Sequence, residues 1–340
     1  MVGIGIIGVG YWGSNLVRAF NETEGAEMVA VADNRPGRLH FVEKRYPHIG
    51  VTPSIEDLLA NPRVDAVAIA TPVPTHYEVA MRVLDAGKHA FVEKPLAYCE
   101  SDATALHEKA KALGLTLAVG HVYQFSPAVE WLTKKLANRG LGELFHIDSS
   151  RINLGPPFSE VDVVWDLAPH DLSILVYVMW SAGLSTAVRR ISVMAGSFTH
   201  EHLTDLVHVF LEFECGMSAH IHVSWVATNK VRLMQVSSEM GTVVFDDMMP
   251  IEKIKVYSGA VDSRRETGEN ESGELSYRPG DIFIPTLPRH EPLSAECRHF
   301  VDCIGTGSEP INGGKIGVEV VRLLEMISRE ITIADMAVAV

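Results

Sequence analysis

The sequence contains few cysteines, and their spacing suggests no cross-links. The 340 residues include only four of them, namely Cys99, Cys215, Cys297 and Cys303. None forms a C-x-x-C pair, the spacing typical of zinc clusters and redox motifs. We therefore expect free thiols, no metal site and a cytoplasmic protein. The chain enters a predicted strand at once, without a basic leader segment, which agrees with that compartment.

Excess positive charge and long apolar runs are also missing. The formal net charge is −14, from 29 Lys and Arg against 43 Asp and Glu, which argues against non-specific nucleic-acid binding. No apolar run approaches the roughly 20 residues that a membrane-spanning helix requires. The hydrophobic fraction is nevertheless 47%, enough for a large core, and the length suits two domains.

Glycine is concentrated near the start of the chain. Residues Gly8–Gly13 read G-V-G-Y-W-G, between a β-branched run at 4–7 and a predicted helix over 14–20. In this pattern the first glycine permits a tight turn, the second lets the backbone approach a pyrophosphate, and the third lets the helix pack on the strand. The pyrophosphate would lie at the helix N-terminus, where N–H groups and the helix dipole attract an anion. The segment therefore predicts a dinucleotide-binding motif.

An acidic residue follows this motif at the expected distance. The apolar run 28–32 ends at Asp33, 20 residues after Gly13. A carboxylate there accepts hydrogen bonds from the ribose hydroxyls and repels a 2′-phosphate, so the sequence favours NAD over NADP. Arg35 and Arg38 are close enough in sequence to keep NADP as the alternative.

Strands and helices alternate as far as residue 121. We expect strands at 64–70, 88–92 and 116–119, and helices at 38–45, 54–59, 77–86 and 101–113, with Ser54 as an N-cap. Repeated β-α units predict a parallel sheet with right-handed crossovers. Residues 1–121 are thus predicted to form a doubly wound Rossmann domain.

The pattern changes beyond His121. A helix at 126–139 is followed by predicted strands at 143–153, 187–199, 206–213, 217–225, 231–237, 242–246 and 252–257. Residues 262–281 are charged and glycine-rich and predict a mobile loop, and helices follow at 292–304 and 315–331. Residues 122–340 are thus predicted to form an α+β domain on a large, open, mainly antiparallel sheet. We expect this domain to bind substrate and to form oligomer contacts, and its last helix is a candidate to pack near the first domain.

Polar residues gather at the predicted carboxyl ends of the parallel strands, where such sheets bind ligands. The loop from Thr71 to His76 follows one strand, and Glu93-Lys94-Pro95 follows another. Lys94 is therefore expected to face the cofactor crevice.

A second cluster, Trp165–Asp171, reads W-D-L-A-P-H-D before an apolar helical run at 172–180. We expect Asp166 to be the N-cap and Pro169 to lie in the first turn. A helical path places Asp166 and His170 on one face, and an Asp–His pair can act as acid and base. The residues alone leave open a plain cap and a core histidine.

Other histidines and cysteines carry weaker signals. His200 with His202, and His220 with His222, alternate without companion acids, which favours surface or interface positions over metal ligands. Cys215 and Cys303 are predicted to belong to the core.

These motifs together resemble the Gfo/Idh/MocA family of oxidoreductases, and the resemblance covers nearly the whole chain. It rests on the glycine fingerprint, Thr71-Pro72 with His76, Glu93-Lys94-Pro95, and Asp166-x-x-x-His170. It implies an NAD(P)-dependent dehydrogenase acting on a CH–OH group, with Lys94 and His170 catalytic and Asp166 beside them. Family members commonly have glycine inside the Asp–His motif, where this chain has Ala168-Pro169. Segments 151–155 and 165–171 are similar to the nucleotide-sugar dehydrogenase branch.

The implied mechanism assigns a role to each candidate. His170 takes the hydroxyl proton while hydride moves to NAD, Lys94 stabilises the developing alkoxide, and Asp166 holds His170. Arg151 and Asn153 are two apart on a predicted strand and share a face, so they are candidates for a substrate carboxylate or phosphate. The predicted substrate contacts are Lys94, Tyr123, Arg151, Asn153, Asp166 and His170. The predicted cofactor contacts are Gly8, Gly10, Tyr11, Trp12, Gly13, Asp33, Asn34, Arg38, Thr71, Pro72, His76, Glu93 and Lys94.

Three functions remain open at this point. The first is oxidation of a nucleotide-linked hexose, with C3 as the candidate position. The second is oxidation of a free polyol, inositol or hexose, and the third is a non-catalytic dinucleotide-binding regulator. In each case we expect a homodimer or homotetramer assembled through the second-domain sheet, with no nucleic-acid or membrane partner.

Overall fold

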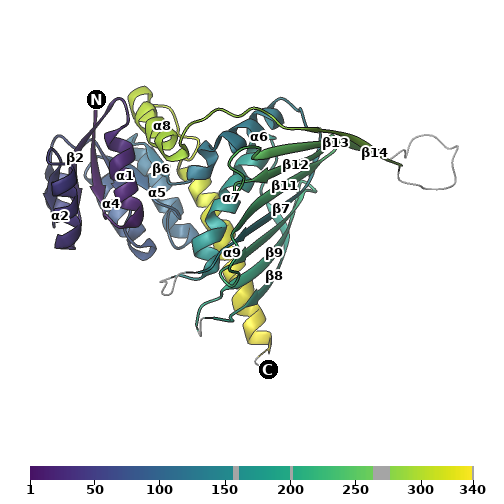
Figure 1. Cartoon of the computed structure of the whole chain (residues 1–340). Helices are drawn as coiled ribbons and strands as arrows, with labels where there is room; N and C mark the ends of the chain where they lie inside the picture. Colours follow the sequence, from purple (N-terminus) through teal and green to yellow (C-terminus); the bar gives the residue numbers. More distant parts are fainter. Residues whose placement is uncertain (156–160, 200–201, 263–275, 339–340) are drawn as a thin grey trace. The chain divides into compact units, whose positions relative to one another are not determined.

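The computed structural model describes residues 1–155, 161–199, 202–262 and 276–338 (Figure 1). The chain forms two compact units. The first contains Met1–Ser126 together with Arg289–Met326, and the second contains Pro127–Pro288 together with the chain from Ile327 onward.

The first unit is built on a six-stranded parallel sheet. Its strands are β1 (Val2–Ile7), β2 (Ala26–Ala32), β3 (Gly50–Thr52), β4 (Ala66–Ile69), β5 (His89–Val92) and β6 (Leu117–Val119). They lie in the order β3-β2-β1-β4-β5-β6, so the winding reverses between β1 and β4. Doubly wound sheets bind their ligands at this switch point. The predicted Rossmann sheet is confirmed.

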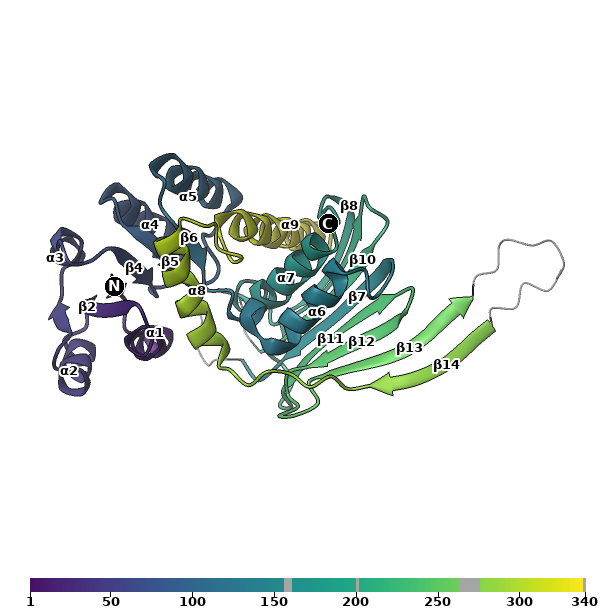
Figure 2. The ribbon, with the colours of Figure 1, turned by 90° about the horizontal axis from the view of Figure 1, so that it is seen from above.

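Helices cover both faces of this sheet. They are α1 (Tyr11–Asn21), α2 (Pro36–Arg45), α3 (Ile55–Ala60), α4 (His76–Asp85) and α5 (Glu100–Leu113), with α1 and α2 on one face and α4 and α5 on the other (Figure 2). Ser54 caps α3 as predicted, because its side chain accepts a hydrogen bond from the Asp57 N–H at 3.1 Å. Two short 3₁₀ helices, η1 (Val73–Thr75) and η2 (Val122–Phe125), complete the early chain.

A helix from late in the sequence completes the first core. In α8 (Pro292–Thr306), Phe300 packs edge-on against Phe20 of α1 and Phe91 of β5, with ring centroids 6.2 and 5.7 Å away. All three rings are fully buried. The final helix α9 (Gly314–Val338) begins in this unit and ends in the second.

The second unit is built on an eight-stranded sheet. Its strands are β7 (Leu144–Ile152), β8 (Val188–Gly196), β9 (Leu206–Phe213), β10 (Ser218–Ser224), β11 (Val231–Ser238), β12 (Gly241–Asp246), β13 (Ile254–Asp262) and β14 (Ser276–Phe283). The order is β14-β13-β12-β11-β7-β10-β9-β8, antiparallel throughout except for the β7–β10 pair. The predicted open sheet and its β9–β10 hairpin are confirmed.

One predicted loop is partly wrong. We expected a mobile loop over 262–281, but residues from Ser276 form the edge strand β14, which pairs with β13. Its charged and glycine-rich composition made this segment resemble a loop, yet an edge strand tolerates such residues and even a proline, here Pro279. Residues 263–275 lie outside the described part of the chain.

The two faces of the second sheet differ. Helices α6 (Pro127–Ala137) and α7 (Val163–Ser181) lie on one face (Figure 2). The opposite face carries Phe210, which is 54% exposed, and stacked imidazoles, with His208 Nδ1 3.1 Å from His220 Nε2. This exposed, partly aromatic surface is called the outer face below.

Candidate functional site

A pocket of about 520 Å³ opens at the carboxyl ends of β1, β2 and β4 in the first unit. Its lining includes the predicted residues Gly8, Gly10, Tyr11, Trp12, Asp33, Asn34, Arg38, Thr71 and Pro72. It also includes Arg35, Pro53, Ile55, Thr75 and Val79, which were not among the predicted contacts. The apolar members carry no pattern that distinguishes them from core residues, so the sequence alone did not single them out.

The glycine loop shapes one wall of this pocket. Gly8 has φ +89°, and a Cβ atom there would lie 2.7 Å from the Ala70 carbonyl oxygen, so any side chain would collide with the end of β4. A Cβ atom on Gly13 would lie 1.9 Å from the Gly8 oxygen. A glycine at this position therefore lets the start of α1 pack closely against the loop that follows β1. The start of α1 has no side-chain cap and no acidic residue in its first turn. Its N–H groups can therefore donate hydrogen bonds to a pyrophosphate.

Asp33 forms the acidic wall of the pocket. Its Oδ2 atom accepts a hydrogen bond from the Val9 N–H at 2.7 Å, and its Oδ1 atom accepts one from the Arg35 N–H at 2.8 Å. The guanidinium of Arg38 lies 3.6 Å from Oδ2. Asp33 therefore fixes the glycine loop as well as facing the ribose position, and Arg38 partly offsets its charge.

Four predicted cofactor residues, namely Gly13, His76, Glu93 and Lys94, do not line this pocket. His76 is buried, with Nδ1 2.8 Å from the Pro95 carbonyl oxygen and Nε2 2.9 Å from that of Thr71. Burial lowers the pKa of His76 despite these two contacts, which favour the charged ring. His76 therefore ties together the loops that follow β4 and β5.

Lys94 follows β5 directly, as predicted. The charge of its ammonium group lowers the pKa of both His76 and His121, secondary in each case to burial, so all three side chains belong to one electrostatic environment. Burial raises the pKa of the neighbouring Glu93 carboxyl to about 7, although Lys94 acts in the opposite direction. The end of β5 therefore holds a cation and an acid that titrates near neutrality.

In the second unit, the predicted start of α7 is wrong. The helix begins at Val163, and its N-cap is Asp162, whose Oδ1 atom accepts hydrogen bonds from Val164 N at 2.9 Å and Trp165 N at 3.1 Å. Asp166 lies in the first turn and Pro169 lies inside the helix. Either Asp162 or Asp166 could cap a helix. The earlier start places the apolar residues Val163 and Val164 in the first turn, where both are buried, and this favours Asp162 as the cap.

Asp166 and His170 occupy one stripe of α7. Between residues 163 and 170 they are the two that are partly exposed, while the others are buried. The Trp225 indole N–H donates to Asp166 Oδ2 at 3.2 Å. A spacing of four residues places both side chains on one helical face, so this stripe presents a carboxylate and an imidazole together.

Arg151 has a different environment from the predicted one. It is 3% exposed, and its Nε atom lies 2.6 Å from Asp171 Oδ2 while its second terminal nitrogen lies 3.2 Å from Oδ1. This two-point ion pair joins β7 to α7 and occupies the guanidinium expected to bind a substrate anion. Asn153 follows β7 and is partly exposed, with its Nδ2 atom donating to the Leu154 oxygen at 3.0 Å. The other predicted substrate residue, Tyr123, is half-buried in η2 of the first unit.

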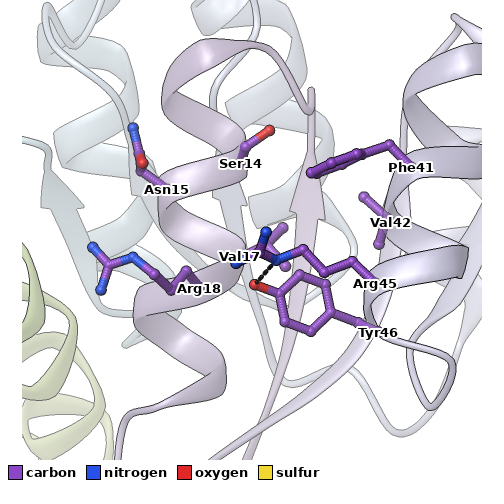
Figure 3. Close-up of a pocket in the computed structure, with 8 residues that line it drawn as sticks. All are labelled: Ser14, Asn15, Val17, Arg18, Phe41, Val42, Arg45 and Tyr46. Carbon is purple, nitrogen blue, oxygen red and sulfur yellow. Dashed lines mark hydrogen bonds between the residues drawn. The ribbon is translucent and has the colours of Figure 1, made fainter.

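A second pocket, of about 160 Å³, lies between α1 and α2 (Figure 3). Its basic residues already have partners. Arg18 pairs with Glu22 and Glu291, and Arg45 donates to the Tyr46 hydroxyl at 3.2 Å. We therefore assign no ligand to it.

The parallel sheet, the glycine loop, the uncapped start of α1 and the acidic end of β2 together define the first unit as an NAD-binding domain. Comparison with known proteins agrees. The family described as "Oxidoreductase family, NAD-binding Rossmann fold" matches residues 2–121, and the "GFO/IDH/MocA C-terminal domain" matches residues 130–244. The chain belongs to the Gfo/Idh/MocA oxidoreductase family.

Individual relatives extend this similarity. The chain is 29% identical over 233 residues to UDP-N-acetylglucosamine 3-dehydrogenase of Acidithiobacillus ferrooxidans, covering 68% of this chain and 70% of that protein. It is 25% identical to scyllo-inositol 2-dehydrogenase (NAD(+)) of Bacillus subtilis, covering 92% and 87%. A solved structure of the Acidithiobacillus enzyme shares the fold, with a TM-score of 0.81 at 23% identity over 97% of each chain.

Two kinds of feature are missing from the described residues. No helix among them combines the length and apolar character needed to span a bilayer. No group of three or more His, Cys, Asp or Glu side chains in this part of the chain is arranged to hold a metal ion.

Proposed function

We propose that this protein is an NAD-dependent dehydrogenase of sugar or polyol hydroxyl groups, with Lys94, His170 and Asp166 as catalytic residues. NAD, when bound, supplies the hydride acceptor. His170 takes the hydroxyl proton, because an imidazole titrates near neutrality. Lys94 donates a hydrogen bond to the same oxygen as it gains negative charge, and Asp166 holds the imidazole and binds a neighbouring hydroxyl.

The observation that carries this proposal is the placement of Lys94. It stands at the carboxyl end of β5, on the same sheet edge as the glycine loop and Asp33. Groups at this edge face the ligand in doubly wound sheets. The partly exposed Asp166–His170 stripe of α7 supports the second half of the proposal, since the residues around it are buried.

The relatives support two substrate classes. We propose a nucleotide-linked hexose first, with C3 as the reacting carbon, because the relative from Acidithiobacillus is named for that class. A free inositol or hexose is the second candidate, favoured by the ion pair that neutralises Arg151, the cation expected to bind a phosphate. NADH formation with UDP-sugars, inositols and free hexoses separates the two. No turnover of any of them, with NAD still bound, would favour the non-catalytic regulator.

Variants test the assigned roles. Lys94→Ala and His170→Ala should each keep NAD binding and a parent-like melting temperature, while turnover falls by roughly two to four orders of magnitude. Lys111→Ala and His40→Ala are matched controls at exposed positions and should match the parent. If His170→Ala kept the parent rate, another base would be required, and Tyr123→Phe would be tested next.

We also propose a cytoplasmic homodimer or homotetramer that assembles through the outer face. The four free thiols agree with a reducing compartment. The exposed ring of Phe210 beside stacked imidazoles is a surface that a second copy could cover. A monomer in light scattering at micromolar concentration would contradict the assembly.

A further inference from the structure

Four polar side chains of the first unit surround the carboxyl end of β6. They are Glu93, His121, Glu296 and Asn312, and we call them the β6 network. His121 and Asn312 are 0% exposed and Glu296 is 1% exposed, while Glu93 is half-buried. Buried polar groups of this kind are costly unless hydrogen bonds satisfy them.

Asn312 connects this network to the sheet and to α8. Its Nδ2 atom donates to the Val119 carbonyl oxygen at 2.7 Å and to Glu296 Oε1 at 3.1 Å. The backbone carbonyl oxygen of Asn312 accepts a hydrogen bond from the Val119 N–H at 2.8 Å. Glu296 is therefore held at the end of β6 by a residue that is itself bonded to Val119 at two points.

Glu93 reaches the same place from β5. A Cβ atom on Gly120 would lie 2.9 Å from Glu93 Oε2, so this carboxyl packs directly against the residue that precedes His121. The Lys94 N–H donates to the same oxygen at 3.3 Å. The position of the Glu93 carboxyl is thus coupled to the backbone of Lys94.

Several buried atoms of the network have no hydrogen-bond partner among the described residues: both ring nitrogens of His121, Glu296 Oε2 and Asn312 Oδ1. Such groups in native proteins are usually satisfied by internal water, which needs two to four polar partners. Donors and acceptors of the required kind are present in three separate places, namely the segment after β6, helix α8 and the segment before α9.

Burial, and then neighbouring charges, shift the pKa values of the network and of the adjacent Cys297. Burial, and then the charge of Glu93, raise the pKa of Glu296 well above its ordinary value, whereas Asn312 acts in the opposite direction. Burial, and then Lys94, lower the pKa of His121 to about 3. The adjacent Cys297 thiol also has a raised pKa because of burial and of Glu296 and Glu93. Both shifts favour the uncharged form, which is an imidazole in His121 and a carboxylic acid in Glu296.

We infer that Glu296 is a positioning residue for the dehydrogenase reaction. As a neutral acid bonded directly to Asn312 and linked by internal water to His121 and Glu93, it holds the Glu93 carboxyl and thereby the backbone of Lys94. This inference rests on the proposed catalytic role of Lys94. Glu296 itself needs no contact with substrate or cofactor.

Two substitutions separate the neutral acid from a charge. Glu296→Gln preserves the shape and polarity of the neutral acid, so kcat and its pH profile should remain within about twofold of the parent. Glu296→Leu removes the hydrogen bonds but fills the space, and should lower kcat by about tenfold to a hundredfold with NADH affinity unchanged. Glu309→Leu, at an exposed position, is the matched control and should match the parent.

The outcomes distinguish the inference from its alternatives. Equal losses in the Gln and Leu variants would show that an ionised Glu296 is required, and parent-like kcat in the Leu variant would show that it positions nothing. Either result overturns the inference. Infrared spectroscopy of the parent should show a carboxylic-acid carbonyl band at pH 7.5 that disappears in Glu296→Gln; its absence in the parent also overturns it. Because this readout needs no turnover, it tests the neutral-acid part of the inference even if the proposed dehydrogenase activity fails or the Leu variant does not fold.

Discussion

His121 should make the protein sensitive to acid. Its ring is 0% exposed, and burial together with Lys94 lowers its pKa to about 3 from the ordinary 6.5. In the unfolded chain the ring takes a proton as the pH falls below about 6.5, whereas the folded protein takes it only near 3. The unfolded state therefore binds more protons within this window, so the free energy of unfolding falls as the pH falls.

The magnitude follows from the two pKa values. One pKa unit corresponds to about 1.4 kcal/mol, so lowering the pH from 7.5 to 5, which crosses part of the window, should cost about 2 kcal/mol. The assay is urea denaturation of the cofactor-free protein at several pH values, comparing the parent with His121→Gln, which carries no titrating ring. The other histidines contribute equally to the free energy of unfolding of both proteins. The difference between the two free energies at each pH therefore reports His121 alone.

The comparison has a clear refutation. His40 is the control, because its side chain is 77% exposed. The free energy of unfolding of His40→Gln should change with pH as that of the parent does. If the free energy of unfolding of His121→Gln fell with pH as steeply as that of the parent, the ring would take its proton in the folded protein at about the same pH as in the unfolded chain. The reasoning from burial would then be wrong, whatever the absolute stability of the variant.

Four further predictions use other parts of the chain. Asp171→Ala leaves the buried Arg151 charge without its partner and should lower the free energy of unfolding, measured by urea denaturation, by about 3–5 kcal/mol. Asp148→Ala is the control: Asp148 is 46% exposed in its pair with His220, so its loss should lower that free energy by no more than about 1 kcal/mol. Asp33→Asn should reduce the preference for NAD over NADP, measured as the ratio of the two dissociation constants in fluorescence titrations. An unchanged ratio would show that the Asp33 carboxylate does not repel the 2′-phosphate of NADP. Turnover of the parent should rise with pH through one ionisation as the His170 ring loses its proton, and a flat profile would exclude this base. Phe210→Asp should shift an oligomer towards monomers in light scattering, and an unshifted mass would place the interface elsewhere.

The sequence predicted the parts of this protein that depend on neighbouring residues. The glycine loop, Asp33 at the end of β2 and the alternation in β9 and β10 follow from local geometry, and the structure has all three. The start of α7 was misplaced because Asp162 and Asp166 are equally good caps in isolation. Burial of the first turn decides between them.

Long-range pairing explains what the sequence could not show. Arg151 meets an aspartate 20 residues later, on a helix packed over its strand. Asn312 meets β6 from 193 residues away. Neither partner has a local signal, so the buried ion pair and the β6 network could be identified only in the folded chain.

Helix α8 belongs to the NAD-binding unit but lies late in the sequence, and this affects how that unit folds. Its core is closed by Phe300, which is synthesised long after Phe20 and Phe91. A fragment ending at residue 126 would leave those two rings without their third partner and β6 without Asn312. During synthesis, part of the apolar face of the first sheet therefore stays uncovered until nearly the whole second unit has left the ribosome. Only then can α8 complete the core of the first unit.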